Sequence, residues 1–235
     1  MSAPVPRILM LHGYTQNADI FRKRLSALRK TCGKNLEFVF VDAPIVLHPA
    51  DLAETFGTTV EDTSNLAALG AGEASAETDD PLLTPRGWWK TDVTGSKTTG
   101  MEESLEFFKG LLKDQHFDAV FGFSQGAAMG AILAALPSGS IAESLFAQPY
   151  TTPTLHVVGK NDIVVIPERS QSLLDVSENK RVEYHDGGHF VPSKASWRNF
   201  LKAWLLDPSG DVPSPGLPAA SQSVSGTTTP AVAAP

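Results

Sequence analysis

The segment "VFGFSQGAAMG", residues 120–130, predicts how the chain folds on both sides of it. It starts with residues that favour a β-strand and ends with small residues that favour an α-helix. Between the two halves, Ser124 stands in the pattern G-x-S-x-G, which is typical of a sharp strand-to-helix turn that exposes its serine. Gly122 and Gly126 leave room where the strand and the helix nearly touch. A structural turn with a chance serine is the alternative, but the flanking strand and helix favour a nucleophilic Ser124.

Strands and helices are expected to alternate along the rest of the chain. Short apolar runs rich in Val, Phe and Leu predict buried strands, and apolar residues at helical spacing predict amphipathic helices. The expected strands cover residues 8–11, 36–44, 117–123, 153–159 and 180–184, and the expected helices cover residues 18–32, 100–114, 125–136, 167–177 and 196–206. This alternation predicts an α/β fold, an open and mostly parallel sheet with helices on both faces and its working groups at the carboxyl ends of the strands.

The composition limits the classes of function. The chain has 235 residues, which suit one domain, and 26 acidic against 19 basic side chains give a net charge of −7. An acidic chain is a poor match for nucleic acid or for an anionic membrane, so the expected partner is a small molecule. The single cysteine, Cys32, excludes an intramolecular disulfide and predicts a reducing compartment. No apolar run is long enough for a signal peptide or a membrane span, so we expect a cytoplasmic protein, with nuclear access left open.

Two segments differ in composition from the main domain, which is expected to span residues 1–206. Residues 58–84 hold six acidic residues and no lysine or arginine, and they predict a mobile acidic insertion. Residues 207–235 hold six prolines and no basic residue, and they predict a disordered tail rich in Pro, Ser, Thr and Ala.

Two further residues follow expected strands and complete a catalytic set with Ser124. Asp162 follows the strand at 153–159, and His189 follows the last strand in the glycine-rich turn "HDGGHFVP". The chain order Ser, Asp, His is that of an α/β-hydrolase triad and differs from the orders of chymotrypsin and subtilisin. The other histidines are expected to be structural, and His12 is expected to shape its own loop by hydrogen bonding.

The three side chains predict a proton relay. A serine hydroxyl is a weak nucleophile, so His189 must take its proton during attack on a carbonyl and return it to the leaving group, while Asp162 orients the ring. The negative oxygen that develops needs N–H donors. The expected backbone donors are Gln125, at the start of its helix, and Tyr14, in the loop after the first strand. Asp42 follows the second strand and is expected to anchor a loop or to edge the pocket.

The sequence resembles the fungal family of serine hydrolases, small α/β-hydrolases whose animal relatives include tumour-suppressor candidates. The shared patterns are, in chain order, "LHGYTQN", "VDAP", "GWW", "EES", "FDAVFGFSQGAA", "PTLHVVGKND" and "GGHFVP", and they span residues 8–206. The resemblance implies hydrolysis of a carboxylic ester or thioester of a small acyl substrate without a cofactor. Some fungal relatives release polyketide chains from a synthase, which makes a carrier-bound polyketide a candidate substrate and secondary metabolism a candidate context. Trp88 and Trp89 fall where the family lines its pocket, with core packing as the open alternative.

One segment departs from the family pattern. After the helix that follows the nucleophile, family members have a further strand, and residues 137–153 hold no convincing one. Either the stretch "SLFAQPY" replaces that strand or the sheet lacks it, which would leave backbone groups unpaired and alter the triad geometry. The leading hypothesis is a serine esterase or thioesterase acting through an acyl-enzyme, and the alternative is an impaired relative that only binds a ligand. Nucleotide-binding glycine motifs and clustered metal ligands are absent from the sequence, so neither class is expected.

Overall fold

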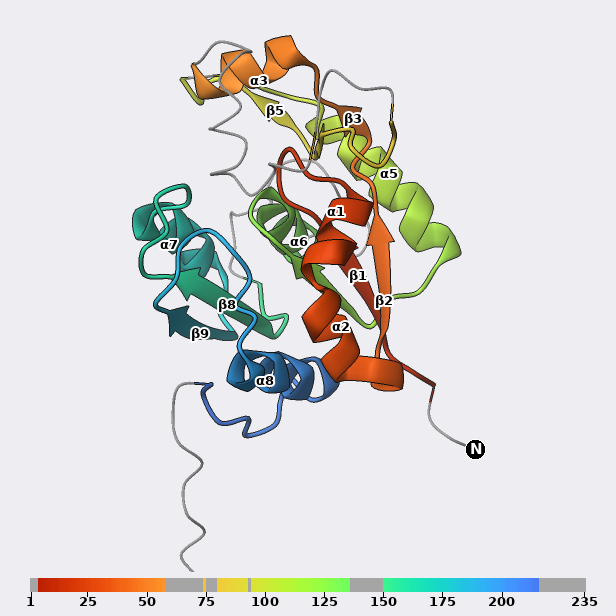
Figure 1. Ribbon diagram of the computed structural model, residues 1–235, viewed down its shortest axis with the longest axis vertical. Helices are drawn as coiled ribbons and strands as arrows, with labels where there is room; N and C mark the ends of the chain where they lie inside the picture. Colours follow the sequence, from red (N-terminus) through yellow and green to blue (C-terminus); the bar gives the residue numbers. More distant parts are fainter. Residues whose placement is uncertain (1–3, 58–73, 75–79, 93, 136–149, 216–235) are drawn as a thin grey trace, which may run out of the picture.

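The centre of the molecule is a three-stranded parallel sheet (Figure 1). The computed structural model describes residues 4–57, 74, 80–92, 94–135 and 150–215. The strands are β1 (Arg7–Leu11), β2 (Glu37–Val41) and β7 (Ala119–Gly122), in the order β2-β1-β7. Leu9 of β1 pairs with Val39 on one side and with Val120 on the other. The central strand is therefore the first strand in the chain.

Helices cover both faces of β1. One layer holds α1 (Ala18–Arg24), α2 (Ser26–Cys32) and α8 (Ala195–Leu206), and the other holds α5 (Met101–Asp114) and α6 (Gln125–Ala135). Ile8 and Met10 pack in the first layer and Leu9 and Leu11 in the second, because side chains alternate across a strand. All four are at most 1% exposed, as a parallel strand covered on both faces requires. No helix in the described part of the chain is long and apolar enough to cross a membrane.

A second parallel pair of strands lies beside this sheet. It consists of β8 (Thr154–Gly159) and β9 (Lys180–His185), which α7 (Pro167–Val176) connects. Among the described residues, β7 and β8 form no pairing with each other, so the sheet is in two parts (Figure 1). The predicted α/β architecture is confirmed. The segment that was expected to lack a strand, 137–153, lies outside the described residues as far as residue 149.

Several elements differ from the sequence prediction for local reasons. The expected helix over residues 18–32 is two helices, because Leu25 has a ψ of 13° and bends the chain where α1 and α2 meet. Elements that were not predicted are η1 (Gly33–Asn35), α3 (Pro49–Phe56) and two antiparallel pairs, β3 (Ile45–Val46) with β4 (Arg86–Gly87) and β5 (Lys90–Thr91) with β6 (Thr98–Thr99). Strands of two residues are too short to show a periodic pattern.

The structure describes parts of the two segments that the sequence predicts to be mobile or disordered. Of the predicted insertion, residues 80–84 form a turn in which Leu82 and Thr84 each accept a hydrogen bond at 3.1 Å from Asn17 Nδ2. Of the predicted tail, Val212 accepts a bond from Arg181 of β9 at 2.6 Å. Part of the segment after the expected boundary at residue 206 is therefore bonded to Arg181 of β9. Residues 58–73, 75–79 and 216–235 lie outside the described part.

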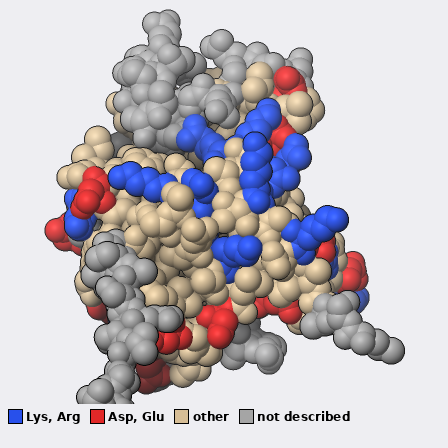
Figure 2. All heavy atoms as spheres, turned by 60° about the horizontal axis from the view of Figure 1, so that its bottom comes forward, with Lys and Arg blue, Asp and Glu red and all other residues tan. Residues whose placement is uncertain are grey.

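Basic side chains are concentrated on packed helices. Residues 18–35 and 194–206, which contain α1, α2 and α8, include one acidic residue, Asp19, and these basic residues: Arg22, Lys23, Arg24, Arg29, Lys30, Lys34, Lys194, Arg198 and Lys202. Arg198 Nε donates to Thr31 Oγ1 at 3.0 Å and so joins α8 to α2. Figure 2, which turns the α8 end forward, shows Lys and Arg gathered on that side. The net charge of −7 is therefore the sum of a basic region, formed by these helices, and a more acidic rest of the chain.

Candidate active site

Ser124 lies in a strained turn between β7 and α6. Its φ of 53° falls in the left-handed region, which L-residues adopt at a cost of about 1–2 kcal/mol. A Cβ on Gly126 would collide with the carbonyl oxygen of Leu11 in β1, and a Cβ on Gly122 would collide with that of Gly126. The two glycines therefore let the helix begin directly against the central strand, as the sequence pattern predicts. The turn holds the serine at the carboxyl end of the sheet.

The structure brings the three predicted side chains together in one hydrogen-bonded row. His189 Nε2 lies 3.0 Å from Ser124 Oγ, and His189 Nδ1 lies 2.8 Å from Asp162 Oδ2. The other oxygen of Asp162 accepts hydrogen bonds from the backbone of Val164 at 2.9 Å and Val165 at 2.8 Å. The side chains of His189 and Asp162 are 7% and 10% exposed. A carboxylate with both oxygens bonded holds an imidazole in one orientation.

The turn that carries His189 is tied to the end of β8. Asn161, two residues after β8, donates its backbone N–H to the Gly187 carbonyl at 3.1 Å and its side-chain amide to the Asp186 carbonyl at 2.8 Å. The Gly187 N–H donates to His185 Nδ1 at 3.1 Å, and burial is the main cause that lowers the pKa of this histidine. Asp162 and His189 therefore reach Ser124 as one unit built on the β8–β9 pair.

The two expected oxyanion donors are free of other acceptors. In the described part of the chain, the backbone N–H groups of Tyr14 and Gln125 donate to no other residue. The carbonyl of Gly13 accepts from His12 Nδ1 at 2.8 Å and from the Gln16 N–H at 3.1 Å. Carbonyl and N–H point in opposite directions across a trans peptide, so these contacts direct the Tyr14 N–H away from His12 and Gln16. A Cβ on Gly13 would lie 3.3 Å from Ser124 Cβ, so this loop abuts the serine.

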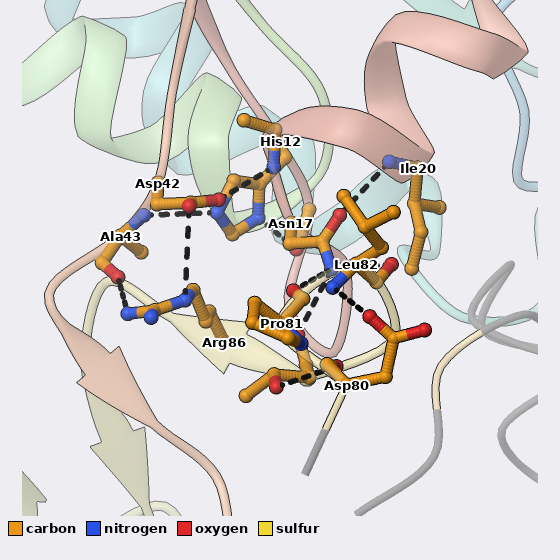
Figure 3. Close-up of polar contacts among 12 residues, drawn as sticks. His12, Asn17, Ile20, Asp42, Ala43, Asp80, Pro81, Leu82 and Arg86 are labelled. Carbon is orange, nitrogen blue, oxygen red and sulfur yellow. Dashed lines mark hydrogen bonds and ion pairs between the residues drawn. The ribbon is translucent and has the colours of Figure 1, made fainter. Parts of the chain in front are cut away.

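His12 links the loops after β1 and β2 (Figure 3). It is fully buried, and its Nε2 accepts the Ala43 N–H at 3.0 Å, so the ring proton is on Nδ1 and is donated to Gly13. Burial lowers the pKa of His12 to about 4, which keeps the ring neutral at pH 7. The hydrogen bonds expected of this histidine are therefore present. Asp42 accepts the Ala18 N–H at 2.8 Å and so anchors the start of α1, which is the loop-anchoring option of its prediction.

Two polar residues of this region were not identified from the sequence. Asn17 caps α1 through Ile20 N–H at 2.8 Å while its amide holds the turn at residues 80–84, and an Asn before a helix is a recognisable capping signal. Arg86 donates to the Ala43 carbonyl at 2.9 Å and pairs its backbone with that of Gln16 (Figure 3). No local pattern marks this arginine, because all its partners are distant in sequence.

The two tryptophans, which the resemblance places in the substrate pocket, pack with a cluster of core residues. Trp88 is 0% exposed, its ring stacks on Phe108 with centroids 5.0 Å apart, and its Nε1 donates to the His12 carbonyl at 2.9 Å. Trp89 packs partly buried against the same core cluster. Core packing, the alternative left open by the sequence, describes Trp88.

A cavity of about 1030 Å³ borders the row of Ser124, His189 and Asp162. It runs between β7, α6, β8 and α7. Its lining is mainly apolar, and it includes side chains such as Ala127, Val158, Val165, Leu173 and Phe190. A site of this kind suits an apolar group that is attached to a reacting carbonyl. Within the described residues, no group of three or more His, Cys, Asp and Glu side chains could hold a metal ion.

The sequence matches a protein-family model described as "Serine hydrolase (FSH1)" over residues 1–140 and 134–201. This chain belongs to the serine hydrolase (FSH1) family. Its relatives include esterase OVCA2 of Danio rerio, which is 34% identical over 87% of this chain and 98% of the relative. Esterase OVCA2 of Xenopus tropicalis is 32% identical over 81% of this chain and 88% of the relative. The expected resemblance is therefore confirmed, and the protein is a serine hydrolase.

Solved structures extend the comparison for the fold of this FSH1 family member. The crystal structure of Zea mays acyl-protein thioesterase 2 superposes with a TM-score of 0.56 at 18% identity, over 87% of this chain and 94% of that one. A carboxylesterase from Mesorhizobium loti gives a TM-score of 0.55 at 14% identity, over 88% and 90% of the two chains. The fold is therefore the predicted α/β-hydrolase fold, and the family is one of serine hydrolases.

Proposed function

We propose that this serine hydrolase cleaves a carboxylic ester or thioester of an acyl substrate through Ser124, His189 and Asp162. The observation that carries the proposal is the unbroken hydrogen-bonded row from Asp162 through His189 to Ser124 Oγ, with distances of 2.8 and 3.0 Å. A base 3.0 Å from a hydroxyl is within proton-transfer reach, and a carboxylate on the far nitrogen sets the tautomer in which Nε2 accepts.

The proposed reaction has two steps, acylation of Ser124 and hydrolysis of the acyl-enzyme, and His189 takes up and returns one proton in each. His189 Nε2 takes the Ser124 proton as Oγ attacks the substrate carbonyl, and the N–H groups of Tyr14 and Gln125 bind the oxyanion. His189 then gives the proton to the leaving alcohol or thiol, and the acyl group stays on Ser124. Water repeats the sequence with the acyl-enzyme and releases the acid. Each oxyanion donor is worth about 10² to 10³ in rate.

The cavity beside Ser124 supports an apolar acyl group as the bound part of the substrate. Its volume of about 1030 Å³ and the side chains of Val158, Val165 and Leu173 suit an alkyl or polyketide-like chain. Hydrolysis rates of p-nitrophenyl esters of increasing chain length, compared with those of acyl-CoA thioesters and of a carrier-bound acyl chain, identify the preferred leaving group. We also propose a cytoplasmic setting, because the single cysteine, Cys32, leaves the chain without an intramolecular disulfide.

A fluorophosphonate probe tests the nucleophile directly. We expect the wild-type protein to be labelled and Ser124→Ala to be unlabelled. Ser26→Ala serves as the matched control, because Ser26 is an exposed serine at the start of α2, and it should be labelled like the wild type. Folded wild-type protein that takes up no probe and hydrolyses no ester would favour the ligand-binding alternative.

A further inference from the structure

The side chain of Gln125 makes two hydrogen bonds that the proposed mechanism does not use. Its Oε1 accepts the Trp88 backbone N–H at 2.8 Å, and its Nε2 donates to the Trp89 carbonyl at 2.8 Å. The side-chain amide of Gln125 therefore bonds to the backbone N–H of Trp88 and to the backbone carbonyl of Trp89, as the backbone of a neighbouring strand could. The same residue carries one of the two expected oxyanion donors on its backbone.

Trp88 continues this connection to the loop that carries the other donor. Its indole Nε1 donates to the His12 carbonyl at 2.9 Å, and its own carbonyl accepts from Ser104 Oγ of α5 at 2.5 Å. Two residues earlier, the Arg86 carbonyl accepts the Thr15 N–H at 2.9 Å. Residues 86–89 therefore contact the Gln125 side chain on one side and the loop at 12–16 on the other.

We propose that the Gln125 side chain is a positioning residue that holds the Tyr14 and Gln125 N–H groups at the spacing an oxyanion requires. It acts through the Trp88–Trp89 backbone and the bond from Trp88 to His12. The inference rests on the proposed function and adds a role for the "GWW" segment, which the sequence had suggested for the substrate pocket. Its physical basis is that oxyanion donors act only when they lie about 2.7–3.1 Å from the developing charge.

The chemistry of the side chain explains why an amide suits this position. Glutamine offers one acceptor and one donor at its tip, which match the N–H of Trp88 and the carbonyl of Trp89. An ionised Gln125→Glu keeps the acceptor but turns a second acceptor toward the Trp89 carbonyl. Gln125→Met keeps the length and loses both bonds. Both variants keep the backbone N–H, so they separate positioning by the side chain from donation by the backbone.

Steady-state kinetics with p-nitrophenyl acetate test the proposal. We expect kcat to fall about 10- to 100-fold in Gln125→Met, because a displacement near 1 Å can cost about 10² in rate. KM should stay within about twofold, since the lost alignment acts on the transition state. A trifluoromethyl ketone, which forms an oxyanion adduct with a serine, should lose affinity in proportion to kcat/KM. Gln171→Met, the same change at an exposed glutamine of α7, should match the wild type.

A second variant tests the path through Trp88. Trp88→Phe keeps an aromatic ring against Phe108 but removes the donor to His12, so it should also lower kcat with little change in KM. Its effect and that of Gln125→Met should be less than additive in the double variant, because both interrupt one connection. Folding of each variant is followed by thermal unfolding, and Gln125→Glu, which loses the bond to the Trp89 carbonyl, tests the proposal if Gln125→Met does not fold.

Three results would overturn the inference while leaving the hydrolase intact. They are a kcat of Gln125→Met within twofold of wild type, a loss confined to KM, and fully additive effects in the double variant. Failure of the proposed function looks different, because Ser124→Ala would then retain ester hydrolysis.

Discussion

The two parts of the sheet contribute differently to the candidate active site. The β2-β1-β7 sheet carries Ser124 and both proposed oxyanion donors, and β1 is buried on both faces. The β8–β9 pair carries Asp162 and His189, and of its strand residues Val158, Gly159 and His185 are buried. In the described residues no backbone pairing joins the two parts. Ser124 and the two proposed donors thus belong to the more deeply buried part, and Asp162 and His189 belong to a more exposed unit.

Side chains make the connection between these parts. The His189 ring lies 4.8 Å from the ring of Phe123, and its Nε2 lies 3.0 Å from Ser124. Leu155 and Val157 of β8 pack against the cluster that contains Trp197 of α8. A change in the packing of the first part, as at Gly126, should affect stability as well as turnover, whereas changes at Ser124 and Asp162 should affect turnover alone. Four experiments test this difference, in order of decreasing effect.

Ser124→Ala gives the largest expected effect. Turnover should fall by about 10⁶, by analogy with nucleophile removal in serine proteases, because Ser124 Oγ is the hydroxyl that His189 Nε2 contacts. The free energy of unfolding should change little, since alanine keeps the Cβ at the same φ. Measured kcat and chemical denaturation check both parts. A variant that keeps more than a tenth of wild-type turnover would exclude Ser124 as the nucleophile.

Asp162→Asn should lower kcat by about 10⁴, because an amide facing His189 Nδ1 favours the wrong tautomer. The remaining oxygen can still accept from Val164 and Val165, so the melting temperature should stay close to that of wild type. Asp186→Asn is the matched control in the same unit, since the Asp186 side chain is 88% exposed. Equal rates for wild type and Asp162→Asn would assign the acid elsewhere.

Gly126→Ala tests the core side of the comparison. Its Cβ would collide with the Leu11 carbonyl, so we expect a loss of about 3 kcal/mol in the free energy of unfolding together with reduced turnover. Gly130→Ala, in the same helix, would meet only a side-chain atom of Val120 at 3.3 Å and should be close to neutral. Urea denaturation measures both. Similar stabilities for the two variants would contradict the close approach of α6 to β1.

The pH dependence of stability gives the smallest expected effect. The pKa of His12 is about 4 in the folded state and near 6.5 in the unfolded state, so the unfolded chain binds a proton that the folded chain excludes. Stability should therefore fall as the pH drops below 6.5 toward 4, by about 2 kcal/mol between pH 6.5 and 5. Burial lowers the pKa of His156 and His185 as well, so they add in the same direction.

Denaturation at several pH values measures this slope in wild type and in His12→Gln. The slope should decrease more in His12→Gln than in His185→Gln, because His12 lies in the more deeply buried part. An unchanged slope in His12→Gln would show that this histidine is not neutral in the folded protein.

Sequence patterns predicted the strands that carry Ser124, Asp162 and His189 better than they predicted the segment between β2 and β7. Local patterns marked the strands, the main helices and the positions of Ser124, Asp162 and His189. The same patterns missed α3 and the two-residue strands at 45–46 and 86–87, which exist because they pair with each other or pack on the core. Composition also gives no sign of the hydrogen bond between Arg181 and Val212, because the two residues are far apart in the chain.

By itself, the sequence determined that a serine follows a strand and opens a helix, and that an aspartate and a histidine follow later strands in hydrolase order. Backbone preferences of neighbouring residues are sufficient for that, because each such signal lies within a few positions. Only the tertiary structure decided that Trp88 is buried and that it donates hydrogen bonds to both the Gln125 side chain and the His12 carbonyl. Hydrogen bonds between residues far apart in the chain leave no periodic trace in the sequence, so they become visible only when the fold brings their partners together.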